Sequence, residues 1–202
     1  RGLAHLGHVP YEDVFMSSRY LEGAILVYLK KNNIVAPNKP KKFDRSKLEK
    51  FVGAYVQEPQ RGKHEWVYDL DITSMYPSCI MSLNISPETK LGKIEGWNPE
   101  EFLQKDNKKT YSITHNSKVL GRYTESELKN MLDNEKVGVA TNGVMYRSDK
   151  TGLLPALLRK WFDERVEYRK LSKKFHEEGN KEQSDYFDRR QYLQKVLLNS
   201  LY

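Results

Sequence analysis

Two closely spaced carboxylates, Asp69 and Asp71, are the first residues of this sequence whose types suggest chemistry. The residues around them, Val67, Leu70 and Ile72, have the apolar and β-branched character of a strand. Because side chains alternate along a strand, both carboxylates are expected on one face. A carboxylate at the end of a strand offers the hard oxygen that a divalent cation such as Mg²⁺ prefers.

A turn and a helix start are expected directly after Asp71. Ser74 is a suitable N-cap residue, and Pro77 falls early enough in the first turn to be tolerated. The free N–H groups at a helix N-terminus attract anions, so this arrangement suits a metal ion together with a phosphate. Spacing alone does not decide the matter, because an Asp beside a strand end often only caps a turn.

The residues that follow Asp71 carry a more specific signal. The sequence D-I-T-S-M-Y-P-S closely resembles the first catalytic motif of family B DNA polymerases, D-x-x-S-L-Y-P-S, with Met75 in the Leu position. Asn84 and the following I-S-P-E-T continue the resemblance, most closely to the polymerases of T4-like phages. The final K-V-L-L-N-S-L-Y resembles a second motif of this family, K-x-x-x-N-S-x-Y-G. The motifs stand in the family order, and the likeness runs through nearly the whole chain.

This resemblance implies template-directed nucleotidyl transfer, in which two Mg²⁺ ions align the primer 3′-oxygen and the α-phosphate. It makes Asp71 the catalytic residue and a metal ligand, with the carbonyl of Ile72 assisting. The backbone of Ser74, Met75 and Tyr76 is expected to bind the triphosphate of the incoming dNTP. The ring of Tyr76 is expected to lie against the sugar and to exclude a 2′-hydroxyl.

The family's partner aspartates belong to a D-T-D motif that is expected beyond Tyr202. Asp69 does not replace them, because it lies on the same expected strand as Asp71, whereas the family's second carboxylate comes from a neighbouring hairpin. We therefore interpret the chain as a fragment that is inactive by itself.

Two long helices are expected at the end of the sequence, joined by a tight turn. At 100° per residue, Arg165 and Arg169 fall on the apolar stripe of the first helix, about residues 155–176. Because like charges four residues apart repel by a few tenths of a kcal/mol, an anionic partner such as a triphosphate is expected. The alternative is that both side chains extend past the stripe to water. The stripe consists of Leu154, Leu158, Trp161 and Phe162.

The second helix is expected from about residue 181. Tyr186, Leu193 and Leu197 should pack on the first helix. The other face combines a cation, two amides and two aromatic rings, which phosphate contact and base stacking would use. The resemblance assigns triphosphate contacts to Arg165, Arg169, Lys195 and Asn199, and it matches Tyr202 to the aromatic under the nascent base pair. The polar face consists of Gln191, Tyr192, Lys195, Asn199 and Tyr202.

The expected fold class is α+β: part of a polymerase palm, with an antiparallel or mixed sheet and helices, plus an antiparallel two-helix fingers hairpin. Residues 1–50 are expected to be mainly helical, with a helix capped by Ser17 or Ser18 and a basic linker after it. The resemblance implies that they connect the exonuclease or N-terminal domain to the palm. It also implies that residues 51–151 form the N-terminal part of the palm, with a variable elaboration at about 90–140 that contains one short helix, and that residues 152–202 form the fingers.

The segment F-V-G-A-Y-V-Q-E-P, residues 51–59, predicts a short strand with a glycine where another backbone can approach closely. It resembles the family's Y-x-G-G/A-x-V segment, which contacts the template strand. The resemblance therefore gives Gly53 and Tyr55 a contact with DNA. On the residues alone, an ordinary strand is an equally good interpretation.

Composition agrees with a polyanionic partner. The chain has 202 residues, a formal net charge of +7 and a pI of about 9.2. No apolar run reaches the roughly 18 residues that a membrane span needs, and no membrane partner is expected. The expected partners are primer–template DNA, dNTP and the remainder of the polymerase chain, and the expected location is the cytoplasm, that of the host if the protein is viral.

Two other classes remain open. One is a metal-dependent glycosyltransferase that would use Asp69 and Asp71 as its sugar-nucleotide motif, and it would need a Rossmann-like parallel sheet. The other is a non-catalytic basic DNA-binding module that would not need Asp71. Metal dependence of nucleotide binding separates both from the polymerase.

Overall fold

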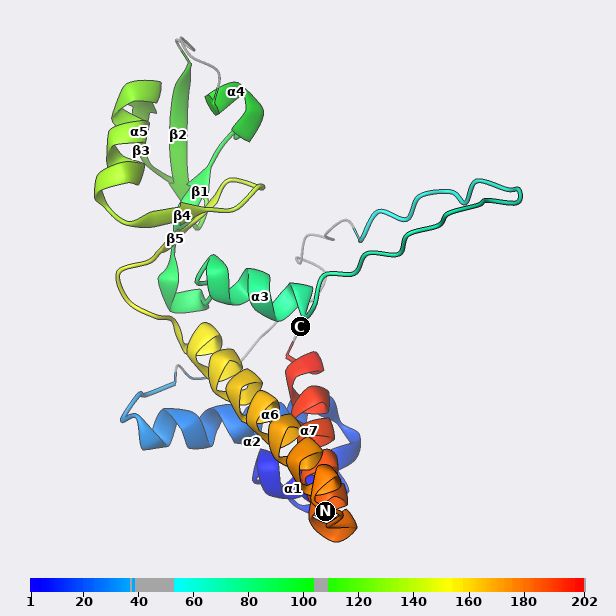
Figure 1. The fold of residues 1–202 in the computed structure, drawn as a ribbon. Coiled ribbons are helices and arrows are strands. Elements are labelled where there is room, and N and C mark those ends of the chain that lie inside the picture. The colour runs from blue at the N-terminus through cyan, green and yellow to red at the C-terminus, as the bar shows by residue number, and fades with distance from the viewer. Residues whose placement is uncertain (37, 39–52, 104–108, 202) are drawn as a thin grey trace.

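The computed structural model describes residues 1–36, 38, 53–103 and 109–201. Figure 1 shows a helical unit built from both ends of the chain, a sheet unit built from its middle, and an extended arm that projects between them. The predicted α+β class is confirmed.

The helical unit joins segments that are far apart in the sequence. Its buried residues come from α2 (Ser17–Lys31), α6 (Leu153–Glu177) and α7 (Lys181–Asn199), and α3 (Met75–Ser82) packs on them through Ile80 and Met81. The short α1 (Gly2–Gly7) lies against α2 and α7, and a 3₁₀ turn, η1 (Tyr11–Phe15), leads into α2. The shared core consists of Tyr20, Ala24, Leu157, Leu158, Trp161, Leu197 and Leu198.

The sheet unit is a five-stranded antiparallel sheet in the order β3-β2-β1-β5-β4. Alternate residues of β2, Tyr111 and Ile113, point into a core that α4 (Pro99–Leu103) and α5 (Glu125–Asn134) cover with Phe102 and Leu128. The strands are β1 (Lys90–Ile94), β2 (Thr110–His115), β3 (Lys118–Thr124), β4 (Val137–Val139) and β5 (Val144–Arg147).

The predicted short helix in this region is confirmed as α5. Thr124 and Glu127 form a capping box at its start, in which each side chain bonds to the backbone of the other residue. The expected elaboration at residues 90–140 is thus more than a loop with one helix, because it supplies four of the five strands and most of the buried residues of the sheet core.

The two-helix hairpin is confirmed, with bounds within two residues of those predicted. Gly179 has a φ of 75° in the turn, a left-handed conformation that suits glycine. The hydroxyl of Ser172 donates to the carbonyl of Ser184 at 3.1 Å, and that of Ser184 donates to the carbonyl of Ser172 at 3.0 Å. These reciprocal bonds hold the two helices close together.

One predicted face of α7 is wrong. Leu197 is buried in the helical core as expected, but Tyr186 is 48% exposed and Leu193 lies against Gly2 of α1. Phe187 faces α6 instead, where its ring stacks on Phe175 with centroids 5.5 Å apart. The error arose because α7 packs against α1 as well as against α6. The spacing of apolar residues in α7 does not show which of these two helices a given residue contacts.

Both strands predicted before residue 73 are wrong. Residues 53–73, which we call the arm, contain no strand, and every one of them is exposed. Figure 1 shows the arm running away from the body and back to α3. A strand needs a hydrogen-bonded neighbour, and among the described residues none lies beside the arm. Phe51 and Val52 lie outside the described residues.

The cap predicted for α2 is also wrong. Ser17 is the first helical residue, and Met16 is the N-cap without a side-chain bond. The predicted linker at residues 39–50 lies outside the described residues. Within the described part of the chain, no helix has the length and apolar character needed to cross a membrane.

Candidate nucleotide and DNA site

The turn into α3 is the local structure on which the candidate site depends. Ser74 is the N-cap, as predicted, but it has φ 53° and ψ 46° and makes no side-chain cap bond. A left-handed backbone at a non-glycine residue is uncommon, and here it reverses the chain between the arm and α3. Pro77 is the third helical residue, while Met75 and Tyr76, 44% and 51% exposed, occupy the first turn.

Asp71 and Ile72 stand at the end of the arm, directly before this turn. Both are exposed, so the Asp71 carboxylate and the Ile72 carbonyl are accessible oxygens. Within the described residues, no three His, Cys, Asp or Glu side chains are grouped to hold a metal ion. Mg²⁺ in phosphate-transfer sites is bound through one or two carboxylates together with substrate phosphates and water. The residues present therefore fit part of a magnesium site.

The helical core brings α3 and the hairpin together. Ile80 and Met81 on the far turns of α3 pack against the core that α6 and α7 share with α2, and α3 lies against α6. Figure 1 shows α3 close to the C-terminal end of α7. α3 and the hairpin thus belong to one packed unit.

Arg165 and Arg169 differ from three lysines of α6 that have acidic partners. The cations Lys160, Lys173 and Lys174 each pair with a glutamate four residues further along the helix. Among the described residues, no salt bridge involves Arg165 or Arg169. These two arginines therefore remain available for an anion.

Arg165 is half-buried, and Arg169 is exposed one turn further along α6. Burial, followed by the positive charge of Arg169, lowers the pKa of Arg165 below its ordinary value. Its Nε donates to the side-chain oxygen of Gln191 over a long 3.4 Å. Gln191 belongs to the face of α7 that was predicted to be polar, so the structure brings part of the two faces together.

Lys195 and Asn199 are exposed on the last turns of α7. At about 100° per residue, Lys195 and Tyr186 lie on opposite sides of α7. The side of α7 that faces α6 lies between these two. Tyr202 lies outside the described residues. Gly53 and Tyr55 lie on the arm, where a Cβ added to Gly53 would meet nothing within 4 Å, so the close approach expected there is not made by the described residues.

Asn84 has a structural role that sequence reasoning missed. Its side-chain nitrogen donates to the carbonyls of Arg147 at 2.6 Å and Lys150 at 2.9 Å, and its oxygen accepts from the Gly152 N–H at 2.8 Å. The residue is 7% exposed and has a φ of 55°. Asn84 thereby joins the segment that follows α3 to the segment that precedes α6. Its partners are more than 60 positions away, so only its place in the resembling motif pointed to it.

Glu88 completes this connection. It lies in the 3₁₀ turn η3 (Pro87–Thr89), and its carboxylate accepts hydrogen bonds from the N–H of Leu153 and from the hydroxyl of Ser86. Burial raises the pKa of Glu88, but these bonds and the charge of Lys150 outweigh burial and lower it below its ordinary value. The negative charge also suits the N-terminus of α6. We call Asn84 and Glu88 the latch.

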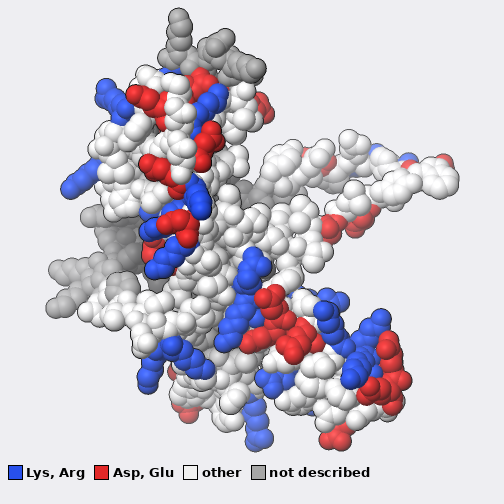
Figure 2. Space-filling model, turned by 60° about the vertical axis from the view of Figure 1, so that its left-hand side comes forward, with Lys and Arg blue, Asp and Glu red and all other residues white. Residues whose placement is uncertain are grey.

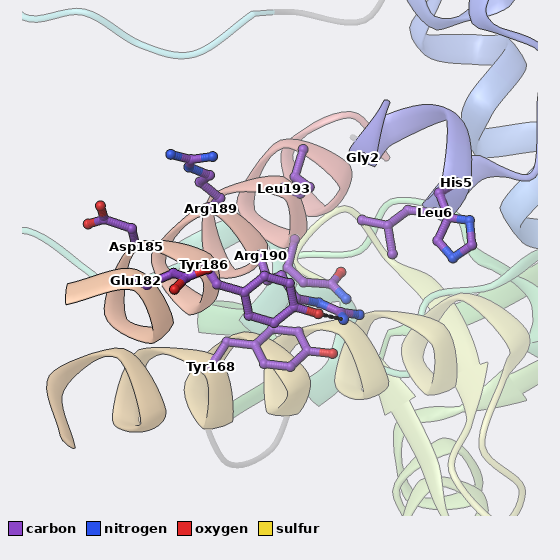
Figure 3. Close-up of a pocket in the computed structure, with 11 residues that line it drawn as sticks. Gly2, His5, Leu6, Tyr168, Glu182, Asp185, Tyr186, Arg189, Arg190 and Leu193 are labelled. Carbon is purple, nitrogen blue, oxygen red and sulfur yellow. Dashed lines mark hydrogen bonds between the residues drawn. The ribbon is translucent and has the colours of Figure 1, made fainter. Parts of the chain in front are cut away.

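A cavity of about 480 Å³ lies on the other side of the hairpin, between α1 and α7. Figure 3 shows Arg190 beside the rings of Tyr168 and Tyr186. Its guanidinium carbon is 4.9 Å and 5.6 Å from the two ring centroids, and it donates to the Tyr186 hydroxyl at 2.7 Å. Arg190 therefore has internal partners that Arg165 does not have.

The surface charge is mixed. In Figure 2, Lys and Arg alternate with Asp and Glu over the sheet unit and the hairpin. On this face the excess positive charge is not gathered into one patch. An anion would therefore be bound by individual cations at defined positions and not by a broad basic surface.

Comparison with known proteins identifies the family. The model of DNA polymerase family B matches residues 14–202, so this chain belongs to that family. It is 29% identical to DNA polymerase 1 of Pyrococcus abyssi over 204 residues, covering 99% of this chain and 21% of that protein. It is 26% identical to the DNA-directed DNA polymerase of Escherichia phage RB69 over 168 residues, covering 83% of this chain and 16% of the phage protein.

A solved structure gives the same result. The family B DNA polymerase from the hyperthermophilic archaeon Pyrobaculum calidifontis matches all of this chain and 21% of its own, with a TM-score of 0.61 and 26% identity. The family prediction is confirmed, and phage relatives are present beside archaeal ones. The chain spans about a fifth of the length of these relatives. The glycosyltransferase alternative is wrong, because the sheet is antiparallel throughout.

Proposed function

We propose that the protein containing this chain is a DNA-directed DNA polymerase that replicates DNA. The observation that carries the proposal is the segment from Asp71 to Tyr76, in which an exposed carboxylate leads through a left-handed turn into a helix N-terminus. Residues 1–50 are then the connector, residues 51–151 the N-terminal part of the palm, and residues 152–202 the fingers. The substrates are primer–template DNA and dNTP, and the enzyme works in the cytoplasm.

Asp71 and the carbonyl of Ile72 would hold Mg²⁺ in this proposal, together with carboxylates contributed by the rest of the polymerase. Two bound Mg²⁺ ions would stabilise the attacking and leaving oxygens of an in-line displacement. The first-turn backbone of α3, from Ser74 to Tyr76, binds the triphosphate tail through its N–H groups. Met75 contributes through its backbone, so a different apolar side chain there is compatible with the role.

The hairpin supplies the positive charge for the triphosphate. Arg165 and Lys195 neutralise its oxygens, while Arg169 and Asn199 add a second charge and an amide. A planar guanidinium can bind two phosphate oxygens at once, which suits an arginine that has no acidic partner on its own helix. Tyr202, Gly53 and Tyr55 contact the DNA, the first beneath the nascent base pair and the other two along the template strand.

The test compares two aspartates on the same arm in the complete polymerase. Asp71→Asn should lower nucleotide incorporation by at least about 1,000-fold, since it removes a metal-binding charge. Asp69→Asn is the matched control and should stay within about threefold of the wild type. Equal loss in both variants, or full activity of Asp71→Asn, would contradict the assignment. A protein that binds DNA without incorporating nucleotide in Mg²⁺ would instead be the non-catalytic DNA-binding module.

A further inference from the structure

A polar contact joins α2 to the end of the hairpin beside the apolar core that these helices share. Tyr20, 5% exposed, has its hydroxyl 2.6 Å from the hydroxyl oxygen of Ser200. These residues are 180 positions apart, and Ser200 is the C-cap residue of α7, directly after Asn199. Buried side chains such as Ala24 and Leu197 pack in the same core.

The direction of this hydrogen bond follows from the other partner of Ser200. The Ser200 hydroxyl also lies 2.8 Å from the carbonyl oxygen of Val196, one turn back in α7. A carbonyl oxygen can only accept, and a serine hydroxyl has only one hydrogen to donate. Ser200 therefore donates to Val196, and Tyr20 donates to Ser200. Two linked hydrogen bonds run from α2 into the backbone of the last turn of α7.

This contact adds a directional restraint to the last turn of α7, which apolar packing already holds in place. Contacts of Leu197 and Leu198 hold the helix against its neighbours, but they are non-directional. A short hydrogen bond has a preferred direction, so it restricts rotation of the last turn about the helix axis. Lys195 and Asn199 are carried by the same two turns.

We propose that Tyr20 is a positioning residue for nucleotide binding. Acting through Ser200, its hydroxyl fixes the orientation of the last turn of α7, and with it the direction of Lys195 and Asn199 toward the triphosphate. Tyr20 does not touch the nucleotide. The proposal rests on the proposed polymerase function, and it makes the connector helix part of the device that selects the nucleotide.

The experiment uses the complete polymerase and three variants. Tyr20→Phe removes only the hydroxyl, Ser200→Ala removes its acceptor, and the double variant removes both. Each single change should raise the KM for dNTP by roughly 3- to 10-fold, the range of one hydrogen bond, with kcat and the Kd for primer–template DNA within twofold. Because both changes break the same contact, the double variant should be no worse than the worse single variant.

A matched control and a second readout separate positioning from stability. Tyr28→Phe makes the same chemical change on the same helix, at a half-buried tyrosine that does not bond to Ser200, and should leave KM unchanged. Hydrogen exchange of the free protein should increase in residues 195–201 of Tyr20→Phe and not in Tyr28→Phe. Faster exchange with unchanged KM would overturn the proposal, and so would additive effects in the double variant or an equal effect of Tyr28→Phe.

The outcome also distinguishes this proposal from the proposed function. If the wild type incorporates no nucleotide, the polymerase assignment fails and the positioning role fails with it, while exchange still reports whether Tyr20 restrains α7. If the wild type is active and Tyr20→Phe is indistinguishable from it, only the positioning role is wrong.

Discussion

The sheet unit and the arm are neighbours in sequence but opposite in how their apolar side chains are placed. Leu128 in the sheet unit is 0% exposed, inside a core made by residues 94–145 alone, whereas Leu70 in the arm is 93% exposed. Trp66 and Tyr68 are likewise exposed on the arm. The segment with the candidate catalytic carboxylate is thus the one that does not build a core of its own.

Two arginines of the hairpin differ in a similar way, because among the described residues one has partners within the fold and the other does not have a close one. Arg190 bonds to Tyr186 and lies over the ring of Tyr168, so its charge is used within the fold. Arg165 is half-buried, and within the described part of the chain its side chain has a long contact to Gln191 and no salt bridge; burial lowers its pKa. Desolvating a cation without a close anion is unfavourable, and a bound triphosphate would offset that penalty. Regions that the fold leaves incomplete are therefore the ones proposed to meet ligands or further chain.

The largest expected effect is on stability, and it tests the contrast between the sheet unit and the arm with one Leu→Ala change in each. In this chain, Leu128→Ala should lower the free energy of unfolding by about 2–5 kcal/mol, because it opens a cavity in the sheet core. Leu70→Ala should change it by less than about 0.5 kcal/mol. Urea unfolding of both variants measures this difference.

Leu70 should behave differently in the complete polymerase, where the arm would pack against the rest of the palm. There Leu70→Ala should also lower the unfolding midpoint. Equal destabilisation of this chain by both changes would show that the arm packs on the body, and the contrast would then be wrong.

The second effect concerns the two arginines. Arg165→Ala in the complete polymerase should lose about 2–4 kcal/mol of transition-state stabilisation, roughly 30- to 1,000-fold in kcat/KM, as for other preorganised charges. Arg190→Ala should lower stability and leave kcat/KM within threefold. Single-turnover incorporation and DNA binding are measured for both. If Arg165→Ala weakens DNA binding and leaves incorporation unchanged, Arg165 is a duplex contact.

Local patterns predicted the parts of the fold that local physics determines. The hairpin bounds follow from helical periodicity and the glycine at 179, and the one short helix predicted in the elaboration is α5. The pattern around Asp71 is that of a strand, yet a strand forms only beside a partner, which the sequence of the segment does not specify.

Long-range side-chain contacts could not be predicted from spacing. Asn84 bonds across more than 60 positions and Tyr20 across 180, and no periodicity relates such pairs. The proposed roles of Asp71, Arg165 and Lys195 came from motif resemblance, and they remain predictions.

The third effect tests Tyr76, which is 51% exposed at the start of α3. A rigid ring against the sugar would exclude a 2′-hydroxyl by overlap, so Tyr76→Ala should raise the ratio of ribonucleotide to deoxyribonucleotide incorporation by roughly tenfold or more. Both nucleotide types are measured on one template in the complete polymerase. Tyr76→Phe is the control and should keep the wild-type ratio. Proportional loss of both activities in Tyr76→Ala, with an unchanged ratio, would indicate a packing role only.

The smallest effect is the pH dependence of the latch. Because the folded-state pKa of Glu88 is lowered, its charge stabilises the fold above the unfolded pKa of about 4.3, and this contribution is lost as pH falls through the folded value. Glu88→Gln keeps an oxygen that can accept from the Leu153 N–H and removes the charge, so it should cost a few tenths of a kcal/mol at pH 7.

The comparison of Glu88→Gln with the wild type should therefore depend on pH. The difference in Tm between the two should be present from pH 6 to pH 8 and should shrink steadily below about pH 4.5, because the wild-type carboxyl then becomes neutral like the amide. Glu65→Gln, at an exposed glutamate of the arm without a salt bridge among the described residues, is the control and should show no such trend. A wild-type advantage that is constant down to pH 3 would mean that Glu88 acts through its shape and hydrogen bonds, and that the charge at the N-terminus of α6 contributes nothing.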